Sequence, residues 1–162
     1  MASDTVPVLR APMRARELDV PPGAGAEFGL SHGLVGIAGA LSLVPHALEA
    51  ALDRLAEERG PKAAAMVRRF AAWPDGVFVW TRVRDGTFRL GRIDGPWRYE
   101  DSAAATAVGI HHVRPAVWLE QPLRESDVPA GVARTFARGG RNLQRIHDAD
   151  VERRTAELWR SP

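Results

Sequence analysis

Apolar residues recur at helical spacing in the second quarter of the chain. Leu48, Leu52 and Leu55 are separated by four and then three residues, which places them on one face of a helix. The pattern predicts a helix over residues 45–60, because a proline suits its first position and a glycine suits the residue after its last. A second helix with its own apolar face is predicted over residues 61–73.

Alternation of apolar and polar residues predicts a β-hairpin in the middle of the chain. Residues 77–83 and 87–93 have the composition of strands, and they flank the dipeptide Asp85-Gly86. This dipeptide is favoured in type I′ hairpin turns, so a tight turn of that type is expected here. Shorter strands are predicted over residues 6–11, 33–39, 114–119 and 142–146.

The remaining segments predict a long loop and two further helices. Prolines and glycines are concentrated over residues 12–27, which indicates a loop. Asp127 is expected to cap a short helix that ends at a Gly-Gly pair, and Asp148 is expected to cap a C-terminal helix over about residues 148–160. The strands outnumber those that a parallel α/β sheet would need. The predicted fold class is therefore α+β, with a mostly antiparallel, barrel-like sheet flanked by helices.

Composition bounds the class of protein. The 162 residues are 45% hydrophobic and 26% charged, which suits one globular domain. The chain has no cysteine, which excludes disulfides, thiol nucleophiles and cysteine-ligated metal sites. No apolar run approaches the roughly 18 residues of a membrane span, and the first residues lack the layout of a signal peptide. These features predict a cytoplasmic protein without a membrane partner.

The charge is unevenly distributed along the sequence. Arginine supplies all but one of the 22 basic residues, and the exception is Lys62. Residues 66–145 hold 13 basic and 8 acidic residues, a net charge of +5, whereas the whole chain has a net charge of +2. Such a stretch is compatible with binding to a polyanion, because each neutralised phosphate releases counterions. A solvated arginine-rich surface would have the same composition.

Residues suited to catalysis or metal binding are few. His111 and His112 are adjacent, so on a strand they would point to opposite sides, and no histidine spacing typical of a metal site is present. His147 and Asp150 could ligate a cation, but Asp148 between them is more simply a helix cap. No nucleophile elbow or phosphate-binding glycine loop occurs in the sequence. We therefore expect no catalytic residue, no metal and no cofactor, and the chain is not predicted to be an enzyme.

Two runs in the middle of the sequence carry a resemblance to a known family. The runs are GVFVWTRVRDGTFRLGRIDGPWRYE and HHVRPAVWLEQPLRESDVP. Their motifs and order resemble the PUA-like superfamily, in particular EVE-type domains, which are related to YTH domains and to reader domains of modification-dependent restriction endonucleases. The resemblance spans about residues 6–146 and implies a single domain over residues 1–162. The first motif is filled by Gly91, Ile93, Gly95, Trp97 and Tyr99, and the second by His112, Arg114, Pro115, Trp118 and Leu119.

The chain departs from this family at the end of one strand. Relatives often have Gly-Trp there, whereas this sequence has Gly39-Ala40, so a pocket wall must come from elsewhere or the pocket is roomier. No nuclease is fused to the domain, which implies a reader that acts with a separate effector protein. Arg114, directly before a proline in a predicted strand, is expected to tether a neighbouring loop.

The resemblance implies a non-catalytic reader of modified DNA, with 5-methylcytosine preferred by analogy and the base flipped into an aromatic pocket. The expected partner is double-stranded DNA with a modified base. An RNA-binding module, or a domain that binds a small ligand or a protein, remains an alternative. By position in the motifs, the candidates for base binding are Arg10, Met13, Gly39, Trp80, Trp97 and Tyr99. The candidates for contact with the nucleic-acid backbone are Arg82, Arg84, Arg89, Arg134, Arg138 and Arg141.

Overall fold

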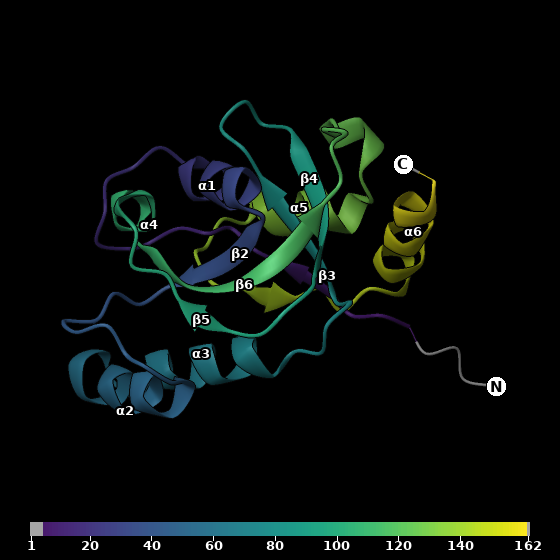
Figure 1. Ribbon diagram of the computed structural model, residues 1–162. Coiled ribbons are helices and arrows are strands. Elements are labelled where there is room, and N and C mark those ends of the chain that lie inside the picture. Colours follow the sequence, from purple (N-terminus) through teal and green to yellow (C-terminus); the bar gives the residue numbers. More distant parts are fainter. Residues whose placement is uncertain (1–4, 162) are drawn as a thin grey trace.

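The computed structural model describes residues 5–161, in which seven strands form one strongly curved sheet (Figure 1). The strand order is β2-β6-β4-β3-β1-β7, and β5 pairs with His112 and Val113 of β6 on the edge opposite β2. The pairing of β1 with β3 is parallel and every other pairing is antiparallel. The strands are β1 (Val8–Arg10), β2 (Leu34–Ala38), β3 (Phe78–Arg82), β4 (Phe88–Ile93), β5 (Arg98–Tyr99), β6 (Ile110–Trp118) and β7 (Gln144–Arg145).

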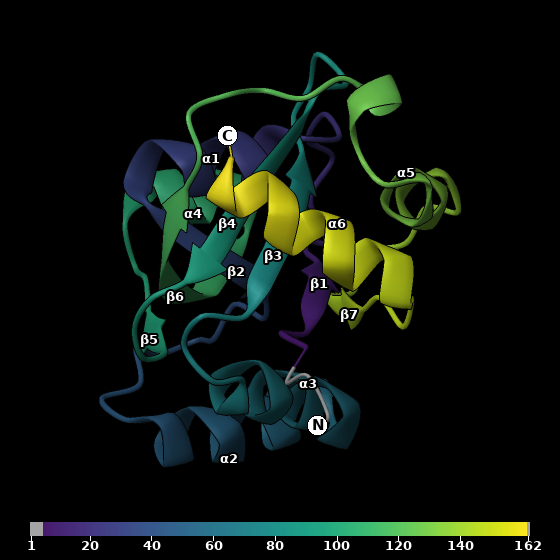
Figure 2. The same cartoon turned by 90° about the vertical axis from the view of Figure 1, so that its right-hand side faces the viewer.

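Six α-helices flank this sheet within residues 5–161. The pair α2 and α3 lies below the sheet in both views, whereas α6 crosses the outer face of β3 and β4 (Figure 1 and Figure 2). The predicted α+β class with a curled, mostly antiparallel sheet is confirmed at this level. The helices are α1 (Ala24–His32), α2 (Leu48–Arg59), α3 (Pro61–Ala72), α4 (Ala103–Val108), α5 (Ala130–Ala137) and α6 (Ala149–Arg160).

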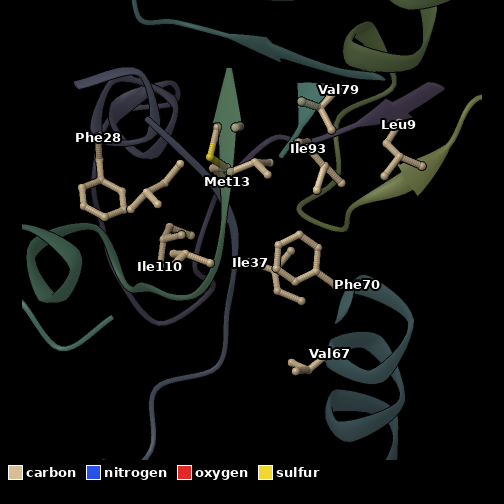
Figure 3. Packing of buried hydrophobic residues seen from close by; sticks show 14 of the residues in the cluster. Leu9, Met13, Phe28, Ile37, Val67, Phe70, Val79, Ile93 and Ile110 are labelled. Atoms are coloured by element: carbon tan, nitrogen blue, oxygen red, sulfur yellow. The ribbon is translucent and has the colours of Figure 1, made fainter. Parts of the chain in front are cut away.

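The curled sheet is a half-barrel that stays open along one side. Strands β2 and β7 are the two ends of the strand order, and α3 lies across the opening between them. Phe70 and Val67 of α3 point toward Ile37 of β2 and pack into the core beside Leu9 of β1 (Figure 3). The opening is therefore partly filled by a helix rather than by an eighth strand.

Both faces of the central strands are buried, because each faces its own hydrophobic cluster. Val79 packs on the face that α3 covers, whereas Phe78 and Trp80 pack on the opposite face against α5 and α6. This arrangement follows from the period of two residues in a strand. Both sides of β3 are therefore interior.

The predicted hairpin is confirmed, but its turn is not of type I′. Strands β3 and β4 pair from Phe78 opposite Arg92 to Arg82 opposite Phe88. A type I′ turn needs positive φ at two successive residues. Here Gly86 has a φ of +89°, whereas Asp85 is not in the positive region. The Asp85 carboxylate instead accepts hydrogen bonds from the Thr87 N–H and hydroxyl at 2.8 and 2.7 Å, which holds a longer connection.

Two other predicted helix boundaries are wrong. Helix α2 begins at Leu48 rather than at Pro45, after Ala47 in extended conformation. Asp127 ends a short 3₁₀ turn and does not cap α5, which begins after Pro129. By contrast, Asp148 does cap α6, because its carboxylate accepts from the backbone N–H groups of the first turn.

Helix α1 occupies part of the segment predicted as a loop. A side chain at Gly25 would place its Cβ 1.8 Å from the Met13 carbonyl oxygen, and one at Gly29 would lie 2.6 Å from the Leu34 oxygen. The glycines that suggested a loop are therefore needed for close packing of a helix against neighbouring backbone. Tertiary packing here overrides the low helix propensity of glycine.

A buried arginine on β6 connects the sheet to the end of α3. The Arg114 side chain donates to the Gly95 carbonyl at 2.7 Å, to the Phe70 carbonyl at 3.1 Å, to the Trp73 carbonyl and to the Asp75 carboxylate at 2.8 Å. The expected tethering role of Arg114 is confirmed. It fixes both the turn before β5 and the last turn of α3.

We predict that Arg114→Ala lowers the free energy of unfolding by about 3–5 kcal/mol, because four acceptors lose a buried charged donor. Urea unfolding followed by circular dichroism measures the change. The control is Arg124→Ala, whose side chain is 82% exposed and pairs only with Asp127. Equal small losses in both variants would contradict the tethering role.

Candidate nucleic-acid interface

A groove runs along the open side of the half-barrel. One wall is the end of β2 with Gly39, and the other is the segment 141–147, which includes β7. Its floor is apolar and contains Ile37 of β2 and Met66 of α3, which are shared by two adjoining hollows of about 470 and 610 Å³. We call these two hollows together the seam groove. Each is in the range of about 300–1,000 Å³ that is usual for ligand sites.

The rim of the seam groove is strongly cationic. Arg59 is ion-paired with Glu17, and Arg145 with Glu152 at 3.3 Å. Within residues 5–161 the remaining basic side chains of the rim make no ion pair. Glu17, the partner of Arg59, is the single acidic residue among those that line the groove. This concentration contrasts with the net charge of +2 for the whole chain. The basic residues of the rim are Arg14, Arg16, Arg59, Lys62, Arg69, Arg141 and Arg145.

A third hollow of about 260 Å³ adjoins the groove at Arg14. It lies beside the β3–β4 turn and is lined by Arg82 and Arg84 among others. Arg84 pairs with Glu27, whereas Arg82 donates to the Gly86 carbonyl at 3.0 Å. The cationic surface therefore continues from the seam groove toward the hairpin turn.

The wall formed by residues 139–142 is held by a second buried arginine. Arg10 of β1 donates to the carbonyl oxygens of Thr135, Gly139 and Asn142 at 2.9, 3.0 and 3.1 Å. Burial and then repulsion from Arg138 lower the pKa of Arg10. Arg10 was a candidate for base binding by sequence, but both of its terminal nitrogens donate to these carbonyls, and its Nε is buried without a partner in the described residues. Its effect on the groove is to position a wall.

Two other candidates for base binding lie inside the protein core. Trp80 has no exposed surface, and its indole N–H donates to the Thr155 hydroxyl at 3.1 Å. Met13, at a φ of +52°, is 2% exposed and packs against α1 at Gly29. Neither side chain presents a face to a ligand in this structure. Gly39 alone among the six candidates lines the seam groove.

Trp97 and Tyr99 form an aromatic cluster with two histidines of β6. The Trp97 ring stacks on His112 at 5.9 Å between centroids, and the Tyr99 ring stacks on His111 at 5.1 Å. The Tyr99 hydroxyl accepts from the backbone N–H of Leu41 at 3.0 Å. One face of each aromatic ring is thus occupied by a histidine of the same protein.

The exposed side of this cluster lines a separate hollow of about 440 Å³. Trp97 and Tyr99 border it together with His46 from the segment before α2 and Ala71 from α3. The hollow and the seam groove share no lining residue, although α3 contributes to both. The aromatic hollow is therefore a separate site from the cationic seam groove.

His112 links the two hollows through one hydrogen-bond chain. The Trp97 indole N–H donates to His112 Nδ1 at 3.1 Å, so this nitrogen must be unprotonated. The other ring nitrogen, Nε2, lies 2.8 Å from the Gly39 carbonyl and donates to it. Burial lowers the pKa of His112 to about 4, and this burial outweighs the opposing effect of the Gly39 carbonyl. His112 is a neutral spacer that fixes Trp97 and the end of β2.

The arginines expected to contact the nucleic-acid backbone do not all gather in one place. Arg89 donates through two nitrogens to the Leu119 carbonyl, and Arg134 lies 3.7 Å from the Asp148 carboxylate. Arg138 is exposed at the end of α5 and lines none of the hollows described above. Those that border the cationic surface are Arg82, Arg84 and Arg141.

Sequence reasoning missed most of the groove rim. Arg14 and Arg16 follow β1 in the proline-rich segment, and Lys62 and Arg69 lie on α3. The first 65 residues have a net charge of −2, which hides this local excess. The one sequence feature that points to this part of the rim is the pair Arg14 and Arg16, which lies in the loop after a strand.

In residues 5–161, no group of three or more histidine, aspartate or glutamate side chains is arranged to hold a metal ion. No helix in the same range combines the length and apolar character needed to span a bilayer. Comparison of the chain with protein-family models, curated proteins and solved structures finds no match in any of the three. The geometry of the site is therefore the basis for a functional proposal.

We predict that His112 makes the protein lose stability as the pH falls from about 6.5 to about 4. The unfolded histidine gains a proton below its ordinary pKa of 6.5, whereas the folded one stays neutral until about 4. The shift corresponds to about 3 kcal/mol of unfolding free energy that is present at pH 7 and lost by pH 4. Urea unfolding of the parent and of His112→Gln at pH 7 and pH 4.5 tests this. A pH dependence as steep in the variant as in the parent would contradict it.

Proposed function

We propose that this chain is a non-catalytic reader of modified DNA that holds the phosphate backbone along the rim of the seam groove. The carrying observation is the convergence of basic side chains around one groove. Arg14, Arg16, Lys62, Arg69 and Arg141 all line it, and none is neutralised by an ion pair within the described part of the chain. Unpaired cations at such density favour a polyanionic ligand, since each phosphate contact releases counterions.

The apolar floor supports a base rather than phosphate alone. The same hollow that the cations border is also lined by the apolar residues Ile37, Ala63 and Met66. Asn142 adds a polar residue to this lining. An extruded base would have apolar contact below and a polar rim around it, as base-flipping sites require. Burial of one methyl group adds only about 0.8 kcal/mol, so selectivity for a modified base also needs polar contact with its edge.

One feature extends this proposal beyond general binding. A curled, open sheet with a groove along its open side is compatible with the resemblance to EVE-type, PUA-like domains. By that analogy, 5-methylcytosine in duplex DNA is the proposed ligand, and a separate effector protein in the cytoplasm would act on the bound complex. The site differs from the sequence expectation, because the proposed base pocket is the seam groove rather than the aromatic cluster.

We predict that Arg14→Ala and Arg141→Ala each weaken binding to all DNA sequences alike. Each should reduce the slope of log affinity against log salt by about 1 unit, because one phosphate contact is lost. Fluorescence anisotropy with a labelled duplex between 50 and 300 mM salt measures both effects. The control is Arg160→Ala, an exposed residue on the last turn of α6 that lines none of the hollows described above. A salt-independent affinity in the parent would favour a metabolite or a protein partner.

A steric variant distinguishes the two hollows. Ala63→Leu adds bulk to the partly exposed face of α3 in the seam groove, and we expect at least a tenfold loss of affinity for a 5-methylcytosine duplex. Trp97→Ala should leave that affinity within about threefold, once melting shows that the variant is folded. The reverse pattern would place the base in the aromatic hollow.

The same binding assay is run with the parent protein on a panel of other ligands. The panel includes unmodified, hydroxymethylcytosine and methyladenine duplexes with their RNA counterparts, so that preference for RNA appears as a separate outcome.

A further inference from the structure

The segment between β2 and α2 presents two apolar side chains to solvent. Leu43 and Val44 are 59% and 56% exposed, and they are the most exposed large hydrophobic residues in the described chain. They are adjacent in sequence and are followed by Pro45. Their side chains are available for contact with an apolar partner. We call residues 41–45 the apolar loop.

The base of the apolar loop is fixed rather than loose. The Leu41 N–H donates to the Tyr99 hydroxyl at 3.0 Å, and the Ser42 N–H and hydroxyl donate to the Glu58 carboxylate at 3.0 and 3.1 Å. Arg59 donates to the Ala40 carbonyl at 2.7 Å. Four hydrogen bonds thus hold the residues directly before Leu43. The two apolar side chains are presented in a defined place.

That place adjoins the cationic groove. The loop begins two residues after Gly39, which lines the seam groove, and Ala40 between them accepts a hydrogen bond from Arg59 on the groove rim. On its other side, Pro45 and His46 border the aromatic hollow. A polyanion held by the rim would therefore bring its stacked bases up to the loop.

We propose that the apolar loop is a wedge that inserts Leu43 and Val44 between base pairs of duplex DNA and occupies the space left by an extruded base. The proposal rests on the proposed function, because it needs a duplex held along the seam groove. Leucine, isoleucine and proline are used as wedges by proteins that unstack base steps. The wedge offsets part of the few kcal/mol that extrusion costs. Single-stranded DNA has no stack to open, so its binding does not use the wedge.

The test compares the parent with the double variant Leu43→Ser, Val44→Ser. The probe is a 5-methylcytosine duplex with 2-aminopurine beside the modified base, whose fluorescence rises when it is unstacked. We expect a rise with the parent and none with the double variant, together with an approximately tenfold weaker duplex affinity. Affinity for the same sequence as a single strand should stay within twofold. Val117→Ser, which changes a residue that is 49% exposed on β6, is the matched control and should behave as the parent.

The outcomes separate the wedge from the function on which it rests. If the parent binds duplex DNA and the double variant binds and unstacks it equally well, the wedge is overturned and the reader proposal stands. If the parent binds neither duplex nor single strand, both are overturned. Equal loss of duplex and single-strand affinity would also overturn the wedge. Binding of the parent, but not the double variant, to anionic lipid vesicles without any effect on DNA would assign the loop to a membrane surface instead.

Discussion

Two buried guanidinium groups determine the shape of this molecule. A buried charge is tolerated only where hydrogen-bond acceptors surround it, so each arginine imposes a position on the backbone that supplies them. Arg114 donates to carbonyls at the end of α3, and Arg10 donates to carbonyls of α5 and of the segment between α5 and β7. Both segments belong to the seam groove, since the end of α3 lines it and residues 141 and 142 form part of one wall. Arg114 therefore fixes the helix across the opening, and Arg10 fixes that wall.

The same hydrogen bonds explain how a groove with a cationic rim keeps its shape. Positive side chains on a shared rim repel one another, and this repulsion pushes the two walls of the groove apart. Here the carbonyl oxygens that Arg10 needs come from Gly139 and Asn142, next to the exposed Arg141. The hydrogen bonds that hold the wall are therefore separate from the exposed arginine that gives the wall its charge. A phosphate ligand can neutralise the rim without any change in what holds the wall.

Much of the architecture was predictable from local pattern, whereas the site was not. The hairpin, α3 and the Asp148 cap of α6 follow from periodicity and capping, which depend on residues close in sequence. Helix α1 was missed because Gly25 and Gly29 are selected by backbone contacts with Met13 and Leu34. The groove was missed for a related reason. Its cations come from the loop after β1, from α2 and α3, and from the segment before β7, and only the curl of the sheet brings these segments together.

The position of β1 has a consequence for how the protein is made. This three-residue strand pairs with Phe78–Trp80 on one side and with Gln144–Arg145 on the other. It is synthesised first of the seven strands but must wait for a partner about 70 residues later and for another about 135 residues later. Contacts of such long sequence separation are formed late, because the loops that they close cost entropy before any pairing is gained. During synthesis, Val8 and Leu9 of β1 therefore lack their full set of strand partners until residues 144–145 have been added.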